Sequence, residues 1–400
     1  MILFMVSCMH VNRLLIEMKR YLFLPLTLVL CLCAVTTWAR KHKRNKMKHT
    51  FKIEVMKGFP NTENGIEKGV SAPFGGVVND YLIMAGGCNF PDKPVFEGGK
   101  KHYYKGVYAA NVAQGNCLSW TKVGELPVEA GYGVSIPSPK GIYMIGGNNL
   151  EGSLKDAYEM VFDSKTMSVQ FNKLPSLPCT LDNMTGTLVN NHIVVAGGVA
   201  DGAPSLKVLT LNLSDVNSGW VEITTLPSSP RVQPVCAAID NKFQLWGGFY
   251  DGSKGGDPVV YTEGLQFDLT KKEWQPLGFI GKDEAHSLTT VGAAAVQFNA
   301  SEVLLTGGVN KDIFFDAISG AYKMVEKQNY LKQPVEWYRF NGTLMLFNAK
   351  TNSWTETNLS SPHLARAGAL MVRANNAIYY VGGELKPGVR SAEVSKITWE

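Results

Sequence analysis

The chain has 400 residues, 45% of them hydrophobic, and a formal net charge of +5 at pH 7. Residues before Arg40 contribute +2 and the segment 40–48 contributes +6, so the remainder carries −3. A basic tail on a faintly acidic body argues against a nucleic-acid-binding surface, and we interpret the tail as a solvated linker. The four cysteines after Ala39 are scattered without CxxC spacing, which indicates neither a metal site nor a disulfide framework.

The first 39 residues have the pattern of an upstream extension followed by a secretory signal peptide. A basic triplet (18–20) precedes an apolar run (22–35), and small residues before Ala39 suit cleavage after that residue. The run of about 14 residues is shorter than the ~20 that a membrane span needs, although a retained anchor is the alternative. We therefore expect a periplasmic or secreted protein that starts at Met1 or Met18, with residues 40–50 as a basic linker.

Six apolar stretches then run directly into a Gly-Gly pair. The second glycines are separated by 60, 51, 50, 60 and 75 residues, and they are Gly87, Gly147, Gly198, Gly248, Gly308 and Gly383. A strand that ends in a double glycine and recurs about every 50 residues is the kelch signature. The sequence therefore predicts an all-β fold, a six-bladed kelch-type β-propeller that occupies residues 51–400 as a single domain.

Each expected blade contains four strands. A strand of small and β-branched residues precedes every Gly-Gly strand, an alternating strand follows it, and a fourth strand often carries Trp before a Leu-Pro turn. The sixth blade runs out of sequence at Glu400 after its third strand. We expect residues 51–60 to supply the missing outer strand, because pairing the two ends of the domain closes the ring.

Strand direction alternates within a blade, so loops that enter first strands and loops that leave Gly-Gly strands meet on one face. Two of these loops are long, spanning 88–106 and 309–342, the second with a short helix expected around 314–325. The polar candidates on this face are Arg231, His286, Arg366, Asn89, Asn148, Asn310, Glu384, Lys386 and Arg390. Arginines and amides at one mouth suit an acidic, polyhydroxylated small molecule.

Most of these candidates also have a purely structural interpretation. Arg231 and Arg366 could tie strands together through carbonyl groups, Asn148 and Asn310 could occupy left-handed turns, and His286 could be a surface residue. The loop from Gly383 to Arg390 differs, because it places one acid and two bases beside Pro and Gly. A simple connector does not need that charge density, although a surface ion pair between Glu384 and Arg390 is the alternative.

The segment GGELKPGVRSAEV (382–394) resembles the sialic acid mutarotases, the N-acetylneuraminate epimerase family, in a cyclically permuted blade order. The segments 85–101, 124–137 and 308–314 share that likeness, which extends over residues 51–400. The resemblance implies that Glu384 and Arg390 are the catalytic pair and that the substrate is sialic acid or a related acidic sugar. One departure is Glu129-Ala130-Gly131-Tyr132-Gly133, where relatives can carry an arginine.

Interconversion of sugar anomers requires proton removal from the anomeric hydroxyl and proton delivery to the ring oxygen. One carboxylate can shuttle these protons while an arginine stabilises charge, so no metal or organic cofactor is expected. The alternative function is a non-catalytic kelch module that binds a protein or glycan at the cell surface. The sequence does not indicate an oligomeric state.

Overall fold

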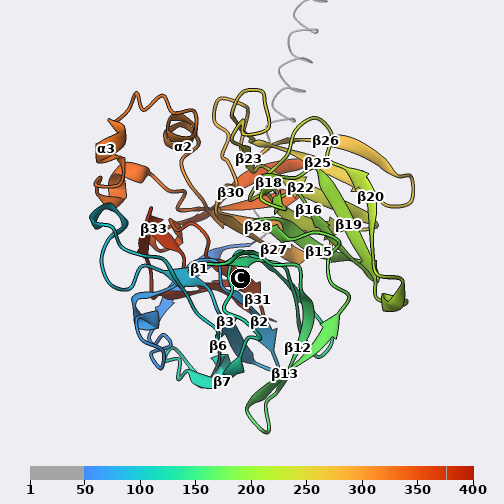
Figure 1. Cartoon of the computed structure of the whole chain (residues 1–400), viewed down its shortest axis with the longest axis vertical. Helices are drawn as coiled ribbons and strands as arrows, with labels where there is room; N and C mark the ends of the chain where they lie inside the picture. The colour runs from blue at the N-terminus through green and yellow to red at the C-terminus, as the bar shows by residue number, and fades with distance from the viewer. Residues whose placement is uncertain (1–48, 375) are drawn as a thin grey trace, which may run out of the picture. The chain divides into compact units, whose positions relative to one another are not determined.

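A computed structural model of the chain describes residues 49–374 and 376–400, of which His49–Glu400 forms one compact unit. The predicted signal peptide and the linker up to Lys48 lie outside the described residues. Within the described part, no helix has the length and apolar character that a membrane crossing requires. The class is all-β, as predicted, and is built from small antiparallel sheets (Figure 1).

Six of these sheets, among the residues described, have four antiparallel strands each. In sheet order they are β2 (Phe74–Val78), β3 (Tyr81–Ala85), β6 (Gly106–Asn111) and β7 (Thr121–Glu125); β8 (Val134–Pro137), β9 (Gly141–Ile145), β12 (Ala157–Asp163) and β13 (Ser168–Leu174); β15 (Thr185–Val189), β16 (His192–Ala196), β19 (Lys207–Asn212) and β20 (Trp220–Thr225); β21 (Val235–Ile239), β22 (Lys242–Trp246), β25 (Glu263–Asp268) and β26 (Glu273–Phe279); β27 (Ala293–Asn299), β28 (Glu302–Gly307), β29 (Thr343–Asn348) and β30 (Ser353–Ser360); β31 (Leu370–Arg373), β32 (Ile378–Val381), β35 (Val394–Trp399) and β1 (Phe51–Met56).

The last sheet joins the two ends of the compact unit. Strand β1 pairs antiparallel with β35 over its whole length, with Phe51 opposite Trp399 and Met56 opposite Val394. The prediction that the 51–60 segment supplies the outer strand of the final sheet is therefore confirmed for residues 51–56, whereas Lys57 forms a bridge with Cys117. This pairing leaves β35 without an open edge, which would otherwise be available for association with another chain.

The Gly-Gly pairs are needed because neighbouring sheets approach each other closely there. A Cβ atom on Gly197 would lie 2.3 Å from the carbonyl oxygen of Arg231, which precedes the next sheet. At Gly382, in the last sheet, the nearest atom is the carbonyl oxygen of Val70, 2.4 Å away and ahead of the first sheet. Both glycines also have positive φ, 70° and 63°, a conformation that costs glycine little.

A second set of contacts links neighbouring sheets through residues that lie one or two positions before each first strand. One residue per sheet has a left-handed backbone there, namely Ala72, Tyr132, Asn183, Gln233, Gly292 and Gly368. The amide of each of Tyr132, Asn183 and Gln233 donates to the carbonyl of the preceding member, at 2.8–3.1 Å. Ala72 likewise donates to Gly368 at 2.6 Å, so the order of hydrogen bonds returns from the last sheet to the first. Thr290 Oγ1 provides the contact to the Gln233 carbonyl, at 3.5 Å.

The hydrophobic core lies between adjacent sheets. Trp246 of β22 is fully buried and meets Phe347 of β29 and Trp354 of β30, with ring centroids 4.9 and 5.3 Å apart. The first strands of successive sheets also pack against one another, and β31 of the last sheet packs against β2 of the first. Small side chains in these strands allow the close approach, as the sequence pattern predicted.

Short hairpins and one long insertion follow the Gly-Gly pairs. The short strands are β4 (Cys88–Asn89) with β5 (His102–Tyr103), β10 (Asn148–Asn149) with β11 (Gly152–Ser153), β14 (Leu181–Asp182) with β17 (Val199–Ala200) and β18 (Ala203–Pro204), β23 (Phe249–Tyr250) with β24 (Val259–Val260), and β33 (Glu384–Lys386) with β34 (Val389–Arg390). The insertion 309–342 contains α2 (Lys311–Ile318), α3 (Lys327–Tyr330) and a 3₁₀ turn (Val335–Tyr338).

The helix in this insertion begins earlier than the sequence predicted, at Lys311 instead of around Phe314. Asn310 is its N-cap, because its Oδ1 accepts hydrogen bonds from the amides of Asp312 and Ile313, both at 3.1 Å. Such a cap satisfies amide groups that a helix leaves unpaired at its start. Asn310 therefore has φ −72°, so its expected left-handed alternative is wrong.

Candidate active site

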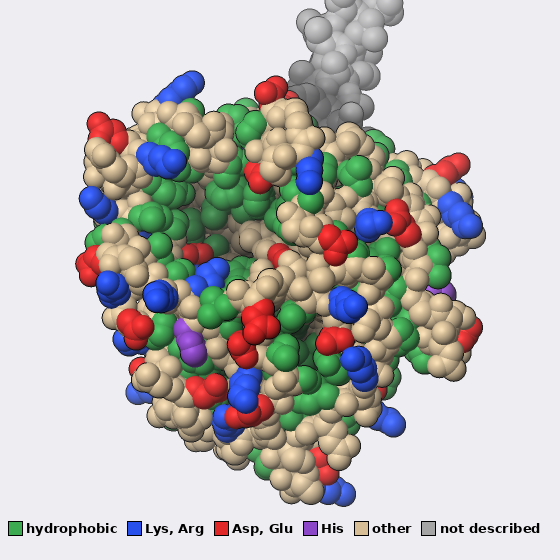
Figure 2. Space-filling view, in the orientation of Figure 1, with side chains coloured by type: hydrophobic (Ala, Val, Ile, Leu, Met, Phe, Trp, Pro, Cys, Tyr) green, Lys and Arg blue, Asp and Glu red, His purple; other side chains and the backbone are tan. Residues whose placement is uncertain are grey.

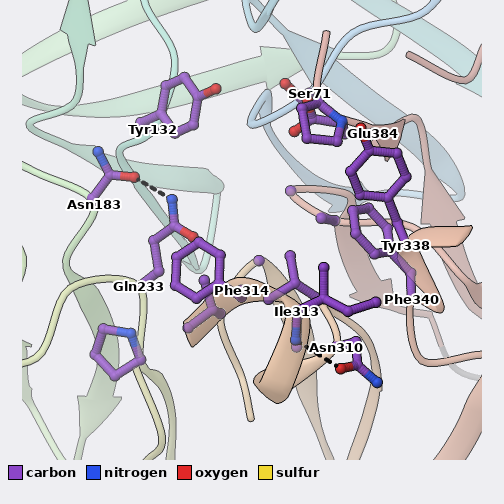
Figure 3. Close-up of a pocket in the computed structure, with 18 of the residues that line it drawn as sticks. Ser71, Tyr132, Asn183, Gln233, Asn310, Ile313, Phe314, Tyr338, Phe340 and Glu384 are labelled. Atoms are coloured by element: carbon purple, nitrogen blue, oxygen red, sulfur yellow. Dashed lines mark hydrogen bonds between the residues drawn. The ribbon is translucent and has the colours of Figure 1, made fainter. Parts of the chain in front are cut away.

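A cavity of about 330 Å³ opens among the residues that precede the first strands and the insertion 309–342. Tyr132, Asn183 and Gln233 form one side, which we call the polar wall (Figure 3). Tyr338 and Phe340 lie on the opposite side, the aromatic wall, and Phe314 lies beside Gln233. Tyr330 and Glu384 also line the cavity. Figure 2 shows a hollow beside the region of α2 and α3, with hydrophobic side chains along part of its surface. A polar and an apolar wall together suit an amphiphilic small molecule.

Glu384 and Arg390 form the ion pair at the edge of this cavity. They lie opposite each other in the β33–β34 hairpin, which explains why six residues separate them in the sequence. Arg390 Nη1 donates to Glu384 Oε1 at 2.6 Å, and the Gly388 amide donates to the same oxygen at 2.7 Å. In the described part of the chain, Glu384 Oε2 has no hydrogen-bond partner. One carboxylate oxygen is thus held in place and the other is available for chemistry.

Arg390 itself is buried, with 4% of its side chain exposed, and its guanidinium lies 5.3 Å from the ring centroid of Phe90. Burial acts to lower the pKa of Arg390, but the Glu384 carboxylate, Tyr132 and Cys88 together outweigh it and raise the pKa. Arg390 Nε is a buried donor without a partner among the residues described. The pair is therefore not a solvated surface contact, which was the alternative interpretation of these two residues.

Tyr132 presents a hydroxyl group toward the side of the cavity where Ser71 and Glu384 lie (Figure 3). Its oxygen accepts a weak hydrogen bond from Cys88 Sγ at 3.7 Å. Burial raises the pKa of Tyr132 well above the ordinary value, and the nearby Cys88 adds to the effect. The phenol therefore stays protonated at neutral pH and can donate a hydrogen bond to a ligand.

Lys101 is a cation near the cavity that the sequence reasoning missed. Its Nζ lies 5.1 Å from the ring centroid of Tyr132 and 5.8 Å from that of Tyr103. No carboxylate of the described residues forms a salt bridge with it. The position of Lys101 in the long 88–106 loop was the one sequence feature that could have indicated it. Sequence alone could not show that this loop folds back over Tyr132.

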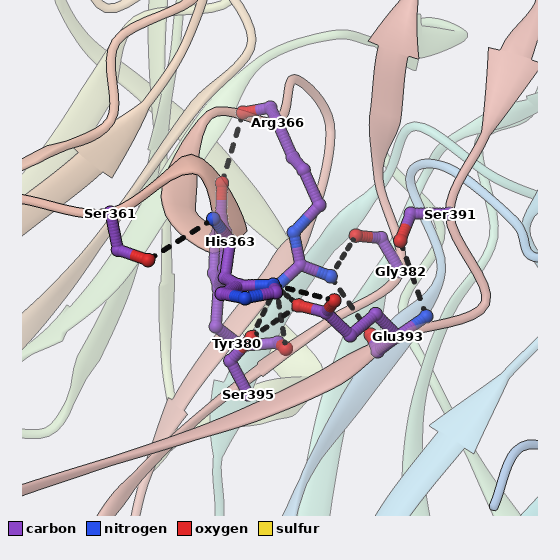
Figure 4. A network of polar contacts seen from close by, with 8 residues as sticks. All are labelled: Ser361, His363, Arg366, Tyr380, Gly382, Ser391, Glu393 and Ser395. Carbon is purple, nitrogen blue, oxygen red and sulfur yellow. Dashed lines mark hydrogen bonds and ion pairs between the residues drawn. The ribbon is translucent and has the colours of Figure 1, made fainter. Parts of the chain in front are cut away.

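Arg231 and Arg366 do not line the cavity. Arg366 is 1% exposed, and its two Nη atoms donate to the carbonyls of Gly382, Glu393 and Tyr380 and to Ser395 Oγ, at 2.8–3.2 Å (Figure 4). Arg231, 2% exposed, donates in the same manner to the carbonyls of Gly247 and Glu263 and to the Glu263 carboxylate. These contacts are the structural alternative that the sequence left open for both arginines.

Two further candidates have their polar groups engaged within the protein. Asn89 is buried and donates to the carbonyls of Gly65 and Gly69, both at 2.8 Å. Asn148 accepts from the Tyr103 hydroxyl at 2.8 Å, and it belongs to β10, so its expected left-handed turn is wrong.

Lys386 and His286 also lie away from the cavity lining. Lys386 Nζ donates to the Gln333 carbonyl at 2.6 Å and thereby ties the β33–β34 hairpin to the insertion. His286 is 73% exposed and its Nδ1 lies 2.7 Å from Asp283 Oδ1. Of the nine predicted site residues, Glu384 and Asn310 line the cavity and Arg390 contacts it through Glu384.

The geometry thus defines an all-β protein with a cavity at the Gly-Gly end of its sheets and a carboxylate–guanidinium pair at its edge. The N-acetylneuraminate epimerase family matches residues 36–169 and 174–400, and the chain belongs to that family. The predicted family resemblance is therefore confirmed.

Individual relatives match over part of their length. The N-acetylneuraminate epimerase of Salmonella typhi is 29% identical over 241 residues, which are 59% of this chain and 60% of the relative. That of Haemophilus influenzae (strain PittEE) is 29% identical over 247 residues, 58% of this chain and 61% of the relative. The chain spans about three fifths of each of these relatives. A solved structure titled "Structure of YjhT" aligns with TM-score 0.48 and 25% identity, over 57% of this chain and 66% of that chain.

Proposed function

We propose that this protein is an isomerase that interconverts the α and β anomers of N-acetylneuraminate or a related acidic sugar. The observation that carries the proposal is the Glu384 carboxylate, which lines the cavity with Oε1 held by Arg390 and Gly388. Family membership supports the reaction class. We further infer a closed six-bladed kelch-type propeller, supported by the cyclic contacts between the six sheets.

In the proposed reaction, Glu384 Oε2 removes the proton of the anomeric hydroxyl. The electron pair of that O–H bond forms the carbonyl, and the bond between the anomeric carbon and the ring oxygen breaks. The ring oxygen takes up a proton, for which the same carboxyl group or the Tyr132 hydroxyl is available. Rotation of the open keto form and the reverse steps close the ring on the other face, with no net gain or loss of protons.

Charge on the substrate also needs a partner. Arg231 and Arg366 have their guanidinium groups committed inside the sheets, so we propose Lys101 as the cation that attracts the substrate carboxylate. Arg390 remains the group that holds Glu384 and stabilises negative charge as the base changes protonation state. The proposed mechanism uses only protein side chains.

The test follows anomer exchange of N-acetylneuraminate by proton NMR with and without the protein. Wild-type protein should accelerate exchange, and Glu384→Gln should reduce the catalysed rate by about 10²–10⁴-fold, because general acid–base catalysis contributes that much. Glutamine still accepts hydrogen bonds from Arg390 and Gly388, and thermal denaturation of the variant checks that the fold is retained. The control is Glu273→Gln, an exposed residue of β26, which should exchange at the wild-type rate.

Two results would contradict the proposal. Wild-type rates in Glu384→Gln would remove this residue from the mechanism. Binding of the sugar by wild-type protein without any acceleration of exchange would instead favour the alternative, a non-catalytic kelch module.

A further inference from the structure

Four polar side chains form a chain of hydrogen bonds that ends in the polar wall of the cavity. Ser153 Oγ donates to Asp182 Oδ2, and Asn183 Nδ2 donates to Asp182 Oδ1 at 2.5 Å. Gln233 Nε2 then donates to Asn183 Oδ1 at 2.9 Å (Figure 3). Asp182 is 4% exposed, while Asn183 and Gln233 line the cavity.

The buried carboxylate decides how both amides are oriented. An ionised carboxylate only accepts hydrogen bonds, so the NH₂ group of Asn183 must face Asp182. The Asn183 carbonyl oxygen then faces Gln233, which must offer its own NH₂ group. Gln233 Oε1 is consequently left as a pure acceptor. It has no hydrogen-bond partner in the described part of the chain.

The backbone holds this acceptor in place as well. Gln233 has φ 54°, and its amide donates to the Asn183 carbonyl at 2.8 Å within the cyclic set of contacts. Figure 3 shows the Gln233 oxygen on the side of the cavity where Phe314 lies. Phe314 is itself fixed against Phe249, with ring centroids 5.1 Å apart and the rings almost perpendicular. A fixed acceptor therefore adjoins a fixed apolar surface.

We propose that Gln233 and Phe314 form a subsite for an acylamino group, with Gln233 Oε1 accepting the N–H and Phe314 contacting the acyl methyl. The proposal rests on the proposed function and assigns recognition of the acylamino group of its substrate to these two residues. A secondary amide of this kind presents one N–H donor beside one small apolar group. These two features match the free acceptor Gln233 Oε1 and the adjacent Phe314 ring. Asp182 is a positioning residue in this arrangement, since it acts through Asn183.

The first experiment compares two substrates, N-acetylneuraminate and the analogue that carries hydrogen in place of its acetamido group. Gln233→Met keeps the length of the side chain and removes the acceptor. Its KM for N-acetylneuraminate should rise about five- to tenfold with kcat unchanged, the effect of one lost hydrogen bond remote from the reacting atoms. Its KM for the analogue should match that of wild-type protein, because the analogue has no N–H at that position. Gln275→Met, at an exposed position of β26, is the matched control.

The second experiment tests the positioning role. Asp182→Ala should raise KM for N-acetylneuraminate roughly threefold and leave KM for the analogue unchanged, because both amides become free to turn. A residue with only a structural role would lower the melting temperature and leave the ratio of the two KM values at the wild-type value. That second outcome would overturn the positioning role of Asp182.

Failure of this inference is distinguishable from failure of the proposed function. Equal KM changes for both substrates in Gln233→Met would overturn the subsite while wild-type exchange still supported the isomerase. If wild-type protein does not accelerate exchange, calorimetric Kd values for the two sugars replace KM. Tighter binding of N-acetylneuraminate than of the analogue, lost in Gln233→Met, would then support the subsite, and equal affinities would overturn it.

Discussion

Arg366 and Arg390 belong to the same repeat, and both guanidinium groups are buried, yet their hydrogen-bond acceptors lie in different parts of the protein. Arg366 lies ahead of β31 and donates to three carbonyls and a hydroxyl inside its own sheet. Arg390 lies after the Gly-Gly pair of that repeat and donates to a carboxylate at the cavity. The comparison indicates that the position of an arginine within the repeat, and not the residue type, decides whether it lies at the candidate site.

Arg231 supports this rule from a different sheet. It occupies the same place in its repeat as Arg366, and its Nη1 donates to the Gly247 carbonyl just as that of Arg366 donates to the Gly382 carbonyl. Each guanidinium also lies over a tyrosine ring, 4.0 Å from Tyr261 just ahead of β25 and 4.4 Å from Tyr380 of β32. Planar geometry and five donors suit such a position better than lysine would.

The largest expected effect is on stability. Arg366→Met should lower the free energy of unfolding by about 3–5 kcal/mol, because the substitution leaves several buried carbonyls without their donor and removes the guanidinium that lies 3.6 Å from the Glu393 carboxylate. Urea denaturation of Arg366→Met and Arg390→Met measures the contrast. An equal loss of stability in both variants would contradict the division of roles.

The next largest effect concerns the contact between a Gly-Gly pair and the arginine that precedes the next sheet. Gly197→Ala should destabilise the protein by about 2–3 kcal/mol, since its Cβ would overlap the Arg231 carbonyl oxygen in addition to the strain at φ 70°. Gly320→Ala is the control, because Gly320 has φ 71° but no atom within 4 Å of the added Cβ. Its cost should be about 1 kcal/mol. Thermal denaturation that ranks the two variants equally would show that inter-sheet contact is not the reason for glycine.

Arg390→Lys tests the proposed role of Arg390 in holding the Glu384 carboxylate. Lysine keeps the charge but lacks the planar fork, so Glu384 would lose its fixed orientation. We expect the catalysed exchange rate to fall about 10–100-fold, with urea stability close to that of wild-type protein. Arg373→Lys, at an exposed position of β31, is the control for the chemical change. Full activity in Arg390→Lys would restrict the role of Arg390 to charge alone.

The smallest effect is a shift in tyrosine ionisation beside Glu384. Burial raises the pKa of Tyr338 to about 12, with a further contribution from Glu384. The folded protein thus favours the protonated phenol, so this contribution to stability is complete below pH 10 and is lost as the pH rises from 10 toward 12. Phenolate absorbance during alkaline titration should show one fewer late-titrating group in Tyr338→Phe. An unchanged late phase would contradict the burial of this phenol.

Several features of the fold could be predicted because each produces a pattern in residues that are close together in the sequence. Six Gly-Gly strands, their flanking small-residue strands and the orphan strand at 51–60 each leave a pattern in neighbouring residues. The Glu384–Arg390 pair was also predictable, since both residues lie in one short hairpin around Pro387-Gly388. Such a turn brings its two arms together without help from distant segments.

The rest of the site depended on contacts between distant segments. Whether Arg366 faces the cavity or its own sheet, whether Lys101 folds back over Tyr132, and whether Gln233 presents its oxygen or its nitrogen all depend on residues 10 to 50 positions away or more. Sequence by itself determined the all-β class, the repeat, the pairing of the N-terminal strand with the last strand and the Glu384–Arg390 ion pair, because each is encoded in local pattern and spacing. Only the tertiary structure decided which polar groups are satisfied inside the sheets and which remain free at the cavity, because hydrogen-bond partners are assigned by packing.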